Sequence, residues 1–106
     1  MIVATLRIKV PWERRKDFLD SARMITGPTC VQPGCISCSF YQDLNDPDAI
    51  ILVEEWESRE NLDDRIKSDS YRVILSLMEL AVEAPEIKIN TISKTEGLEA
   101  IEALRL

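Results

Sequence analysis

The first part of the chain alternates apolar and polar side chains over residues 2–10, which is the pattern of a half-buried β-strand. Pro11 ends this strand, because proline cannot donate a hydrogen bond to a ladder. Apolar side chains then recur at helical spacing over residues 12–26, with charged residues between them. We expect a helix here that ends at Gly27-Pro28, since this pair of residues usually stops a helix.

A β-hairpin is predicted over residues 33–58. Its first strand covers 35–42, which is rich in β-branched, aromatic and small residues, and its second covers 50–56, which begins with an apolar run. Residues 45–48 (Asn-Asp-Pro-Asp) form the loop, because Asn and Asp bond their own backbone and Pro fixes φ. Ser58 follows the second strand at the position of a helix N-cap.

A helix in two pieces is expected from Ser58 to about Glu83, because Ser68-Asp69-Ser70 interrupts the apolar spacing. Residues 86–93 alternate again and predict a fourth strand. The last residues, 95–106, place leucine and isoleucine at helical spacing, which predicts a short amphipathic helix.

This order of elements, strand-helix-strand-strand-helix-strand, is typical of the ferredoxin-like α+β fold, an antiparallel four-stranded sheet with helices on one face. We expect a single domain over residues 1–106, with a core of 1–93 and a helical extension of 94–106. Residues 50–53 are apolar on both faces of their strand, and such strands are usually buried on both faces. We therefore expect a homodimer in which a second sheet covers the open face.

The chain carries 13 basic and 19 acidic residues, which gives a net charge of −6 at pH 7. An acidic protein repels a phosphate backbone, so nucleic acid is not an expected partner. No run of residues approaches the roughly 18 apolar side chains that span a bilayer, so we expect no membrane partner either. An apolar start followed by charges is the reverse of a secretory signal, which predicts a cytoplasmic protein.

Three cysteines, Cys30, Cys35 and Cys38, follow the spacing C-x4-C-x2-C, which also occurs in plant-type iron–sulfur sites. Such a site needs a fourth cysteine, which the chain lacks, and a zinc site without histidine would need a carboxylate or a second subunit beside the three thiols. On a regular strand Cys35 and Cys38 would point to opposite faces. We therefore expect free thiols in a reducing compartment and no metal site.

Several short motifs, taken in order, resemble the antibiotic biosynthesis monooxygenase family of the dimeric α+β barrel superfamily. They are Pro33-Gly34-Cys35-Ile36-Ser37, Asp46-Pro47, Glu54-Glu55-Trp56-Glu57-Ser58 and Ser68-Asp69-Ser70-Tyr71. The element order is similar to that of the family over residues 1 to about 93. The resemblance implies a homodimer in which two sheets form a barrel, with a pocket between sheet and helices in each subunit.

The resemblance also implies an activity. Family members described as monooxygenases oxidise phenolic or quinol-like substrates with O2 and need neither metal nor flavin, so the implied ligand is a small aromatic molecule and no cofactor is implied. The protein must then exclude water, orient the ring and help a proton leave.

The chain departs from the family at several positions, including Asp63-Asp64-Arg65-Ile66, where many relatives carry a histidine in the second helix. Aligning Trp56 with a tryptophan of the polyketide-oxidising members places Leu52 and Leu62 where those members have asparagine and tyrosine. Haem-degrading relatives use a helix histidine as axial ligand, and the matching position here is Leu75. Because the chain has no histidine, haem degradation of that type is not expected.

Three residues are candidates for catalysis. Trp56 would form a ring-stacking wall of the pocket or would belong to the core. Glu54 shares a strand face with Trp56 and would accept a proton if it faces the pocket; the alternative is an exposed or ion-paired strand end. Arg65 would hold a phenolate or carboxylate, or is an ordinary surface arginine.

Further residues are candidates for the pocket walls: Tyr71, Asn90, Leu52, Leu62, Leu75 and Met78. Tyr71 would bond a ligand or pack in the core, and Asn90 would line a cavity or face solvent at a sheet edge. Our first hypothesis is a cofactor-independent monooxygenase, and the second is a non-catalytic ligand-binding dimer on the same fold. A third, a thiol redox or iron–sulfur protein, rests on the cysteine spacing alone.

Overall fold

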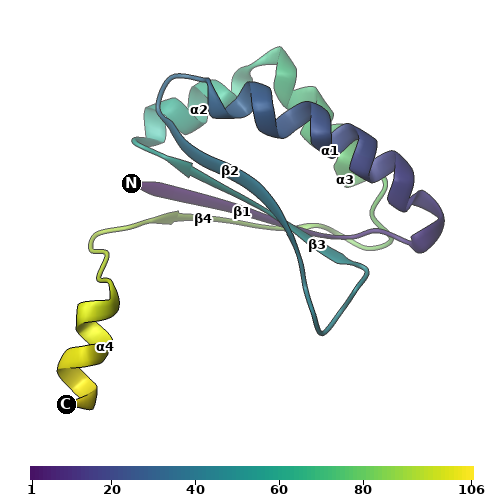
Figure 1. Ribbon diagram of the computed structural model, residues 1–106. Coiled ribbons are helices and arrows are strands. Elements are labelled where there is room, and N and C mark those ends of the chain that lie inside the picture. The colour runs from purple at the N-terminus through teal and green to yellow at the C-terminus, as the bar shows by residue number, and fades with distance from the viewer.

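The computed structural model describes residues 1–106 and contains a four-stranded antiparallel sheet with the strand order β2-β3-β1-β4. The elements in chain order are β1 (Ile2–Lys9), η1 (Trp12–Arg14), α1 (Arg15–Cys30), β2 (Cys35–Gln42), β3 (Ala49–Trp56), α2 (Arg59–Lys67), η2 (Asp69–Tyr71), α3 (Arg72–Glu79), β4 (Glu86–Thr91) and α4 (Leu98–Arg105). Helices α1, α2 and α3 lie on one side of the sheet (Figure 1). The ferredoxin-like α+β architecture predicted from the element order is therefore confirmed.

The main core lies between this covered face of the sheet and helices α1 and α3. Leu6 of β1 lies opposite Leu52 of β3, and both side chains are buried under the helices. Phe18 of α1 packs edge-on against Phe40 of β2, with ring centroids 5.7 Å apart. Each fully buried side chain of this size contributes about 1.5–3 kcal/mol, so the core holds the helices in place over the sheet.

Helix α1 is longer at its C-terminus than the sequence predicted. It runs through Gly27 and Pro28 and ends at Cys30. Pro28 removes a single hydrogen bond, to the carbonyl four residues earlier, and it lies on the exposed side of the helix, where water can hydrate that carbonyl. Thr29 is buried against the core, so packing continues through the last turn.

The second helical region begins and breaks as predicted, but it ends early. The Ser58 hydroxyl oxygen accepts a hydrogen bond from the Asn61 N–H at 3.2 Å, and the chain is extended at Ser68 before η2 begins. Helix α3 ends at Glu79 rather than near Glu83. The reason is that the Val82 N–H donates to the carbonyl of Lys9 at 3.0 Å, so the chain leaves the helix to join the end of β1.

Strand β2 contains a bulge directly after Cys35 that the sequence did not reveal. Cys35 lies opposite Trp56 and Cys38 lies opposite Glu54, and both partners face the helices. The two thiols therefore share the covered face, and the expectation that they point to opposite faces is wrong. The extra residue, Ile36, resets the alternation of the strand. All three cysteines are free thiols.

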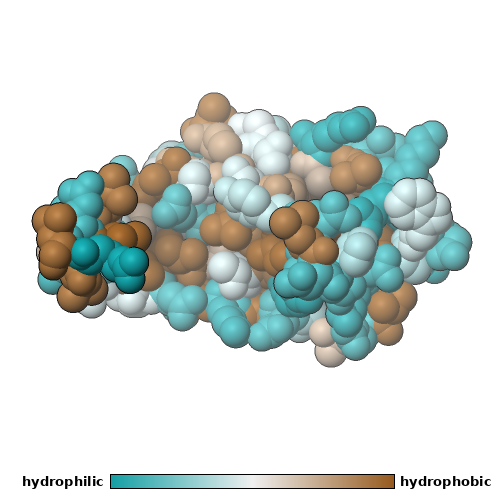
Figure 2. Space-filling view, turned by 60° about the horizontal axis from the view of Figure 1, so that its bottom comes forward, coloured by the Kyte–Doolittle hydropathy of each residue, from teal (hydrophilic) through white to brown (hydrophobic).

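The opposite face of the sheet, which we call the open face, carries no helix of this chain. Arg7 and Lys9 lie there and form ion pairs with Asp43 (3.0 Å) and Asp46 (3.1 Å) of the loop between β2 and β3. Seen from that side, apolar residues are interspersed with polar ones (Figure 2). Helix α4 projects on the same side (Figure 1). None of the helices has the length and apolar character needed to cross a membrane.

Candidate functional site

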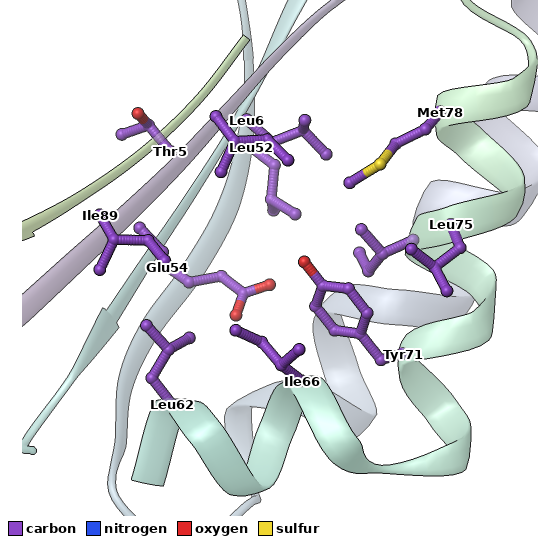
Figure 3. A pocket seen from close by; sticks show the side chains of 13 residues that line it. Thr5, Leu6, Leu52, Glu54, Leu62, Ile66, Tyr71, Leu75, Met78 and Ile89 are labelled. Atoms are coloured by element: carbon purple, nitrogen blue, oxygen red, sulfur yellow. The ribbon is translucent and has the colours of Figure 1, made fainter. Parts of the chain in front are cut away.

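A cavity of about 290 Å³ lies between the sheet and helices α2 and α3 (Figure 3). This volume is at the lower end of the range of ligand pockets and suits a molecule of one or two rings. Most of the residues that line it are apolar: Ala4, Thr5, Leu6, Leu52, Glu54, Leu62, Ile66, Tyr71, Ile74, Leu75, Met78, Ile87 and Ile89.

Glu54 supplies the only carboxylate among these lining residues. The even-numbered side chains of β3 face the helices, and Glu54 is one of them. Its side chain is 4% exposed and points into the cavity (Figure 3). The Trp56 Nε1–H donates a hydrogen bond to Glu54 Oε1 at 3.0 Å. Arg65 Nη2 lies 3.6 Å from Glu54 Oε2. Two groups from different elements thus hold the carboxylate at the cavity wall.

Arg65 extends from α2 toward the sheet and is only 2% exposed. Its Nη1 donates to Ser70 Oγ at 3.2 Å, and its guanidinium carbon lies 5.3 Å from the centroid of the Tyr71 ring. Its Nε and Nη2 have no hydrogen-bond partner. A guanidinium remains charged in proteins, so Arg65 compensates the negative charge of Glu54.

The Tyr71 hydroxyl is a second polar group that points into the cavity (Figure 3). Burial raises the pKa of Tyr71 above its usual value, and the charge of Glu54 adds to this rise, while Arg65 opposes it. The phenol is therefore protonated at neutral pH. It can donate a hydrogen bond to an oxygen atom of a ligand.

Two thiols lie on β2 opposite Glu54 and Trp56. Burial raises the pKa of Cys38 to about 12, and the charge of Glu54 is the next cause. Burial also raises the pKa of Cys35, and the nearby Cys30 thiol contributes. Because the thiolate is the reactive form, Cys35 and Cys38 are not nucleophiles at neutral pH.

The predicted catalytic residues come together, although only one of them lines the cavity. Trp56 is fully buried against Ile2 and Leu62, and it reaches the site through its Nε1–H. Arg65 does not lie on the surface; it lies beside Tyr71 and pairs with Glu54. Glu54 faces the cavity, as one interpretation of this residue expected, and it is also ion-paired, as the other expected.

Of the predicted wall residues, the structure places Leu52, Leu62, Tyr71, Leu75 and Met78 around the cavity. Asn90 is elsewhere: it lies opposite Val3 in the β1–β4 ladder, on the open face, and is exposed. The alternation of a strand explains this, because Ile87 and Ile89 line the cavity and Asn90 must point the other way.

Other residues of the site were not predicted. Ile66, Ile87 and Ile89 complete the wall. Their spacing carried a usable signal, since Ile66 follows Leu62 by four positions on one helix face and the two β4 isoleucines share a strand face. Ser70 accepts a hydrogen bond from Arg65, and the sequence offered no sign of this beyond the break in the helix.

This arrangement can bind a neutral, largely apolar molecule that carries an O–H or N–H group. Glu54 accepts the hydrogen bond, and with it a proton, while Tyr71 donates to a second polar atom of the ligand. No group of three or more His, Cys, Asp or Glu side chains is arranged to hold a metal ion.

Residues 1–75 match the sequence pattern of the family described as antibiotic biosynthesis monooxygenase. Over 98 residues the chain is 30% identical to an uncharacterised protein of Synechocystis sp., and the match covers 92% of this chain and 67% of that relative.

The fold is similar to that of several solved structures. A conserved protein of Methanosarcina mazei is 28% identical with a TM-score of 0.80, covering 84% of this chain and 89% of that chain. A protein of Mycobacterium tuberculosis is 18% identical with a TM-score of 0.81, over 91% and 98% of the two chains. A structure described as an antibiotic biosynthesis monooxygenase is also 18% identical, with a TM-score of 0.79 over 89% and 100%.

The family match spans more than half of the chain, and it agrees with the motifs around the β2–β3 hairpin and Tyr71. The chain therefore belongs to the antibiotic biosynthesis monooxygenase family.

Proposed function

We propose that this protein is a cofactor-independent monooxygenase that oxidises a small aromatic or quinol-type substrate with O2 in the pocket beside Glu54. The observation that carries the proposal is a buried carboxylate at the wall of an otherwise almost entirely apolar cavity. A quinol suits such walls, because its ring is apolar and its hydroxyl groups are hydrogen-bond donors.

In this reaction the quinol supplies all the electrons that reduce O2. Glu54 takes the proton of a ring hydroxyl, and the resulting anion gives one electron to O2. Superoxide and the substrate radical then combine, which forms a bond between oxygen and a ring carbon. The O–O bond breaks as water leaves, so the products are a hydroxyquinone and one water molecule.

The other residues of the site have separate roles in this proposal. Arg65 stabilises the charge of the Glu54 carboxylate at 3.6 Å, and the Trp56 Nε1–H fixes one of its oxygens. Protonated Tyr71 donates a hydrogen bond to the second oxygen of the quinol. The apolar walls line the space around the radical pair, which must be shielded from water.

Oxygen uptake with a panel of hydroquinones tests the proposal. Glu54→Gln should lower kcat by about 10²–10⁴-fold, the range of a general base, without abolishing quinol binding. Glu60→Gln is the matched control, because Glu60 is an exposed carboxylate on the neighbouring helix α2 and does not line the cavity. Its kcat should equal that of the wild type.

A protein that binds these quinols in calorimetry but consumes no oxygen with any of them would contradict the oxygenase. That result would favour the alternative function, a non-catalytic small-ligand-binding dimer on the same fold.

We also propose that the protein is a homodimer through the open face. Val3, Ile51 and Val53 lie on this face and remain partly exposed in one chain, so a second copy would bury them. Sedimentation at micromolar concentration should give twice the chain mass of 12.1 kDa, and Val53→Lys should give the single-chain mass. A wild type that sediments as one chain would contradict the dimer.

The free thiols suit the reducing cytoplasm, where we place the protein.

A further inference from the structure

Helix α4 is amphipathic and has no partner within its own chain. Leu98, Ile101 and Leu104 recur every three residues along it, and each is more than 60% exposed. No residue of α4 is buried. A helix of eight residues is marginal when isolated in water, so this apolar stripe requires a covering surface to be stable.

The C-terminal arm, which we define as residues 92–106, leads away from the pocket of its own subunit. The Ile92 N–H donates to the carbonyl of Met1 at 2.9 Å, which fixes the point where the arm leaves the sheet. From there α4 projects on the open-face side, opposite the helices that enclose the pocket (Figure 1). The radius of gyration is 15.5 Å, whereas a compact domain of this length has about 13 Å. The chain is therefore extended by its arm.

A second group of exposed apolar residues surrounds the mouth of the pocket. Ile66, Leu75, Ile87 and Ile89 line the cavity, yet each is between 39% and 52% exposed. Ile87 and Ile89 belong to β4, an edge strand with every residue exposed. We call these four residues the pocket rim. The rim leaves the cavity open to water, whereas the proposed oxidation requires water to be excluded.

We propose that α4 of one subunit covers the pocket rim of a second copy of this chain, so that each site is completed by its partner. This inference rests on the proposed homodimer through the open face. A two-fold axis that crosses the strands stacks the open faces and brings the two β4 edges together. Helix α4, which already projects on that side, then passes the edge of the partner's sheet. A two-fold contact is reciprocal, so each subunit gives one helix and receives one.

The C-terminal arm is long enough for α4 to reach the pocket rim of the partner subunit. Stacked sheets lie about 10 Å apart. The six residues between β4 and α4 can extend to about 20 Å, and α4 adds about 12 Å. The charges also match, because Glu102 flanks the stripe of α4 and Lys67 flanks the rim beside Ile66.

Cross-linking between differently marked chains tests the proposal. In the 106-residue chain with Cys30→Ser, Cys35→Ser and Cys38→Ala, one preparation carries Leu104→Cys and the other carries Leu75→Cys. The two are mixed, allowed to exchange subunits and oxidised mildly with oxidised glutathione. A covalent species of twice 12.1 kDa should form at least about tenfold faster than with Met24→Cys in place of Leu75→Cys, since docking raises the effective concentration of the two thiols. Met24 is the matched control because it is an exposed apolar residue on α1, outside the rim.

A chain that carries both Leu75→Cys and Leu104→Cys distinguishes the subunit that receives the helix. A disulfide that forms only within one chain, or a mixture that cross-links no faster than the Met24 control, would overturn the proposal. As a second readout, a maleimide should label Leu75→Cys about tenfold faster when Ile101→Asp and Leu104→Asp disrupt the stripe, because a docked helix shields its contact surface. An unchanged labelling rate would also overturn it.

Neither readout depends on turnover, so the two proposals fail separately. Cross-linking without oxygen uptake would contradict the oxygenase proposal and support the proposed interface. Oxygen uptake without cross-linking would contradict the proposed interface and support the oxygenase proposal.

Discussion

The two faces of the sheet place ion pairs in opposite environments. On the covered face, Arg65 and Glu54 lie 3.6 Å apart, with side chains 1% and 5% exposed. On the open face, Arg7 and Asp43 lie 3.0 Å apart, with side chains 34% and 27% exposed. The open-face pair is shorter, yet within a single chain we expect it to contribute less, because water screens it. Burial rather than distance decides what each pair does.

This difference has a functional consequence. A charge pair in water is replaceable, whereas a buried carboxylate must keep both its counter-charge and its hydrogen-bond donor. Glu54 has both, from Arg65 and Trp56. The covered face can therefore hold a charged proton acceptor inside an apolar pocket, and the open face cannot.

Removal of the arginine from each pair is expected to give the largest contrast. Arg65→Met leaves the Glu54 carboxylate buried and uncompensated, which should lower the free energy of unfolding by about 3–5 kcal/mol. Arg7→Met should lower it by only about 0–1 kcal/mol in the single chain, because side chains that are 34% and 27% exposed leave this pair open to water. Urea denaturation measures both, in the Val53→Lys background that keeps the chain single. Equal losses for the two variants would remove the distinction between the faces.

The hydrogen bond from Trp56 should have an intermediate effect. Trp56→Phe keeps an aromatic ring but deletes the Nε1–H that Glu54 accepts, which should cost about 1.5–3 kcal/mol because the acceptor is charged. Tyr41→Phe is the control on the open face, where the side chain is more than half exposed in the single chain; in the Val53→Lys background it should change stability by less than about 0.5 kcal/mol. If Trp56→Phe proves as harmless as Tyr41→Phe, the hydrogen bond does not support the site.

The decrease in stability at alkaline pH should show a smaller effect. The pKa of Cys38 is raised from 9.0 to about 12 in the folded protein, so folding favours the neutral thiol. Its contribution is complete below pH 9 and is lost as pH rises toward 12, by at most about 1.4 kcal/mol per pH unit. Cys38→Ala should flatten the decline of the urea midpoint between pH 9 and 11. Between pH 6 and 8 the thiol is neutral in both states, so there the variant should not change the slope; an unchanged slope above pH 9 as well would contradict the prediction.

Sequence reasoning succeeded where a repeating pattern governs the structure. The strand alternation and helical spacing predicted the sheet, the split second helix and the Ser58 cap, because local periodicity and capping chemistry decide them. It failed where a single residue breaks the period. The bulge at Ile36 moved Cys35 to the covered face, and the hydrogen bond from Val82 to Lys9 ended α3 early.

The candidate site was predicted in part for the same reason. The alternation of β3 put Glu54 and Trp56 on one face, but whether that face held a cavity depended on how α2 and α3 pack. The depth of Arg65 and its contact with Ser70 are tertiary features without a local signal. Of the two positions expected for Asn90, a cavity wall or solvent at a sheet edge, the strand alternation selects the second.

Calorimetric binding of a matched ligand pair, 2-naphthol and 2-naphthoate, tests whether the Glu54 carboxylate governs the pocket. We expect neutral 2-naphthol to bind with its hydroxyl on Glu54, and the carboxylate of 2-naphthoate to be repelled by Glu54. Glu54→Gln should then narrow the difference between the two affinities. Naphthoate that binds the wild type as tightly as naphthol, with no change in Glu54→Gln, would contradict the claim that this buried carboxylate governs the pocket.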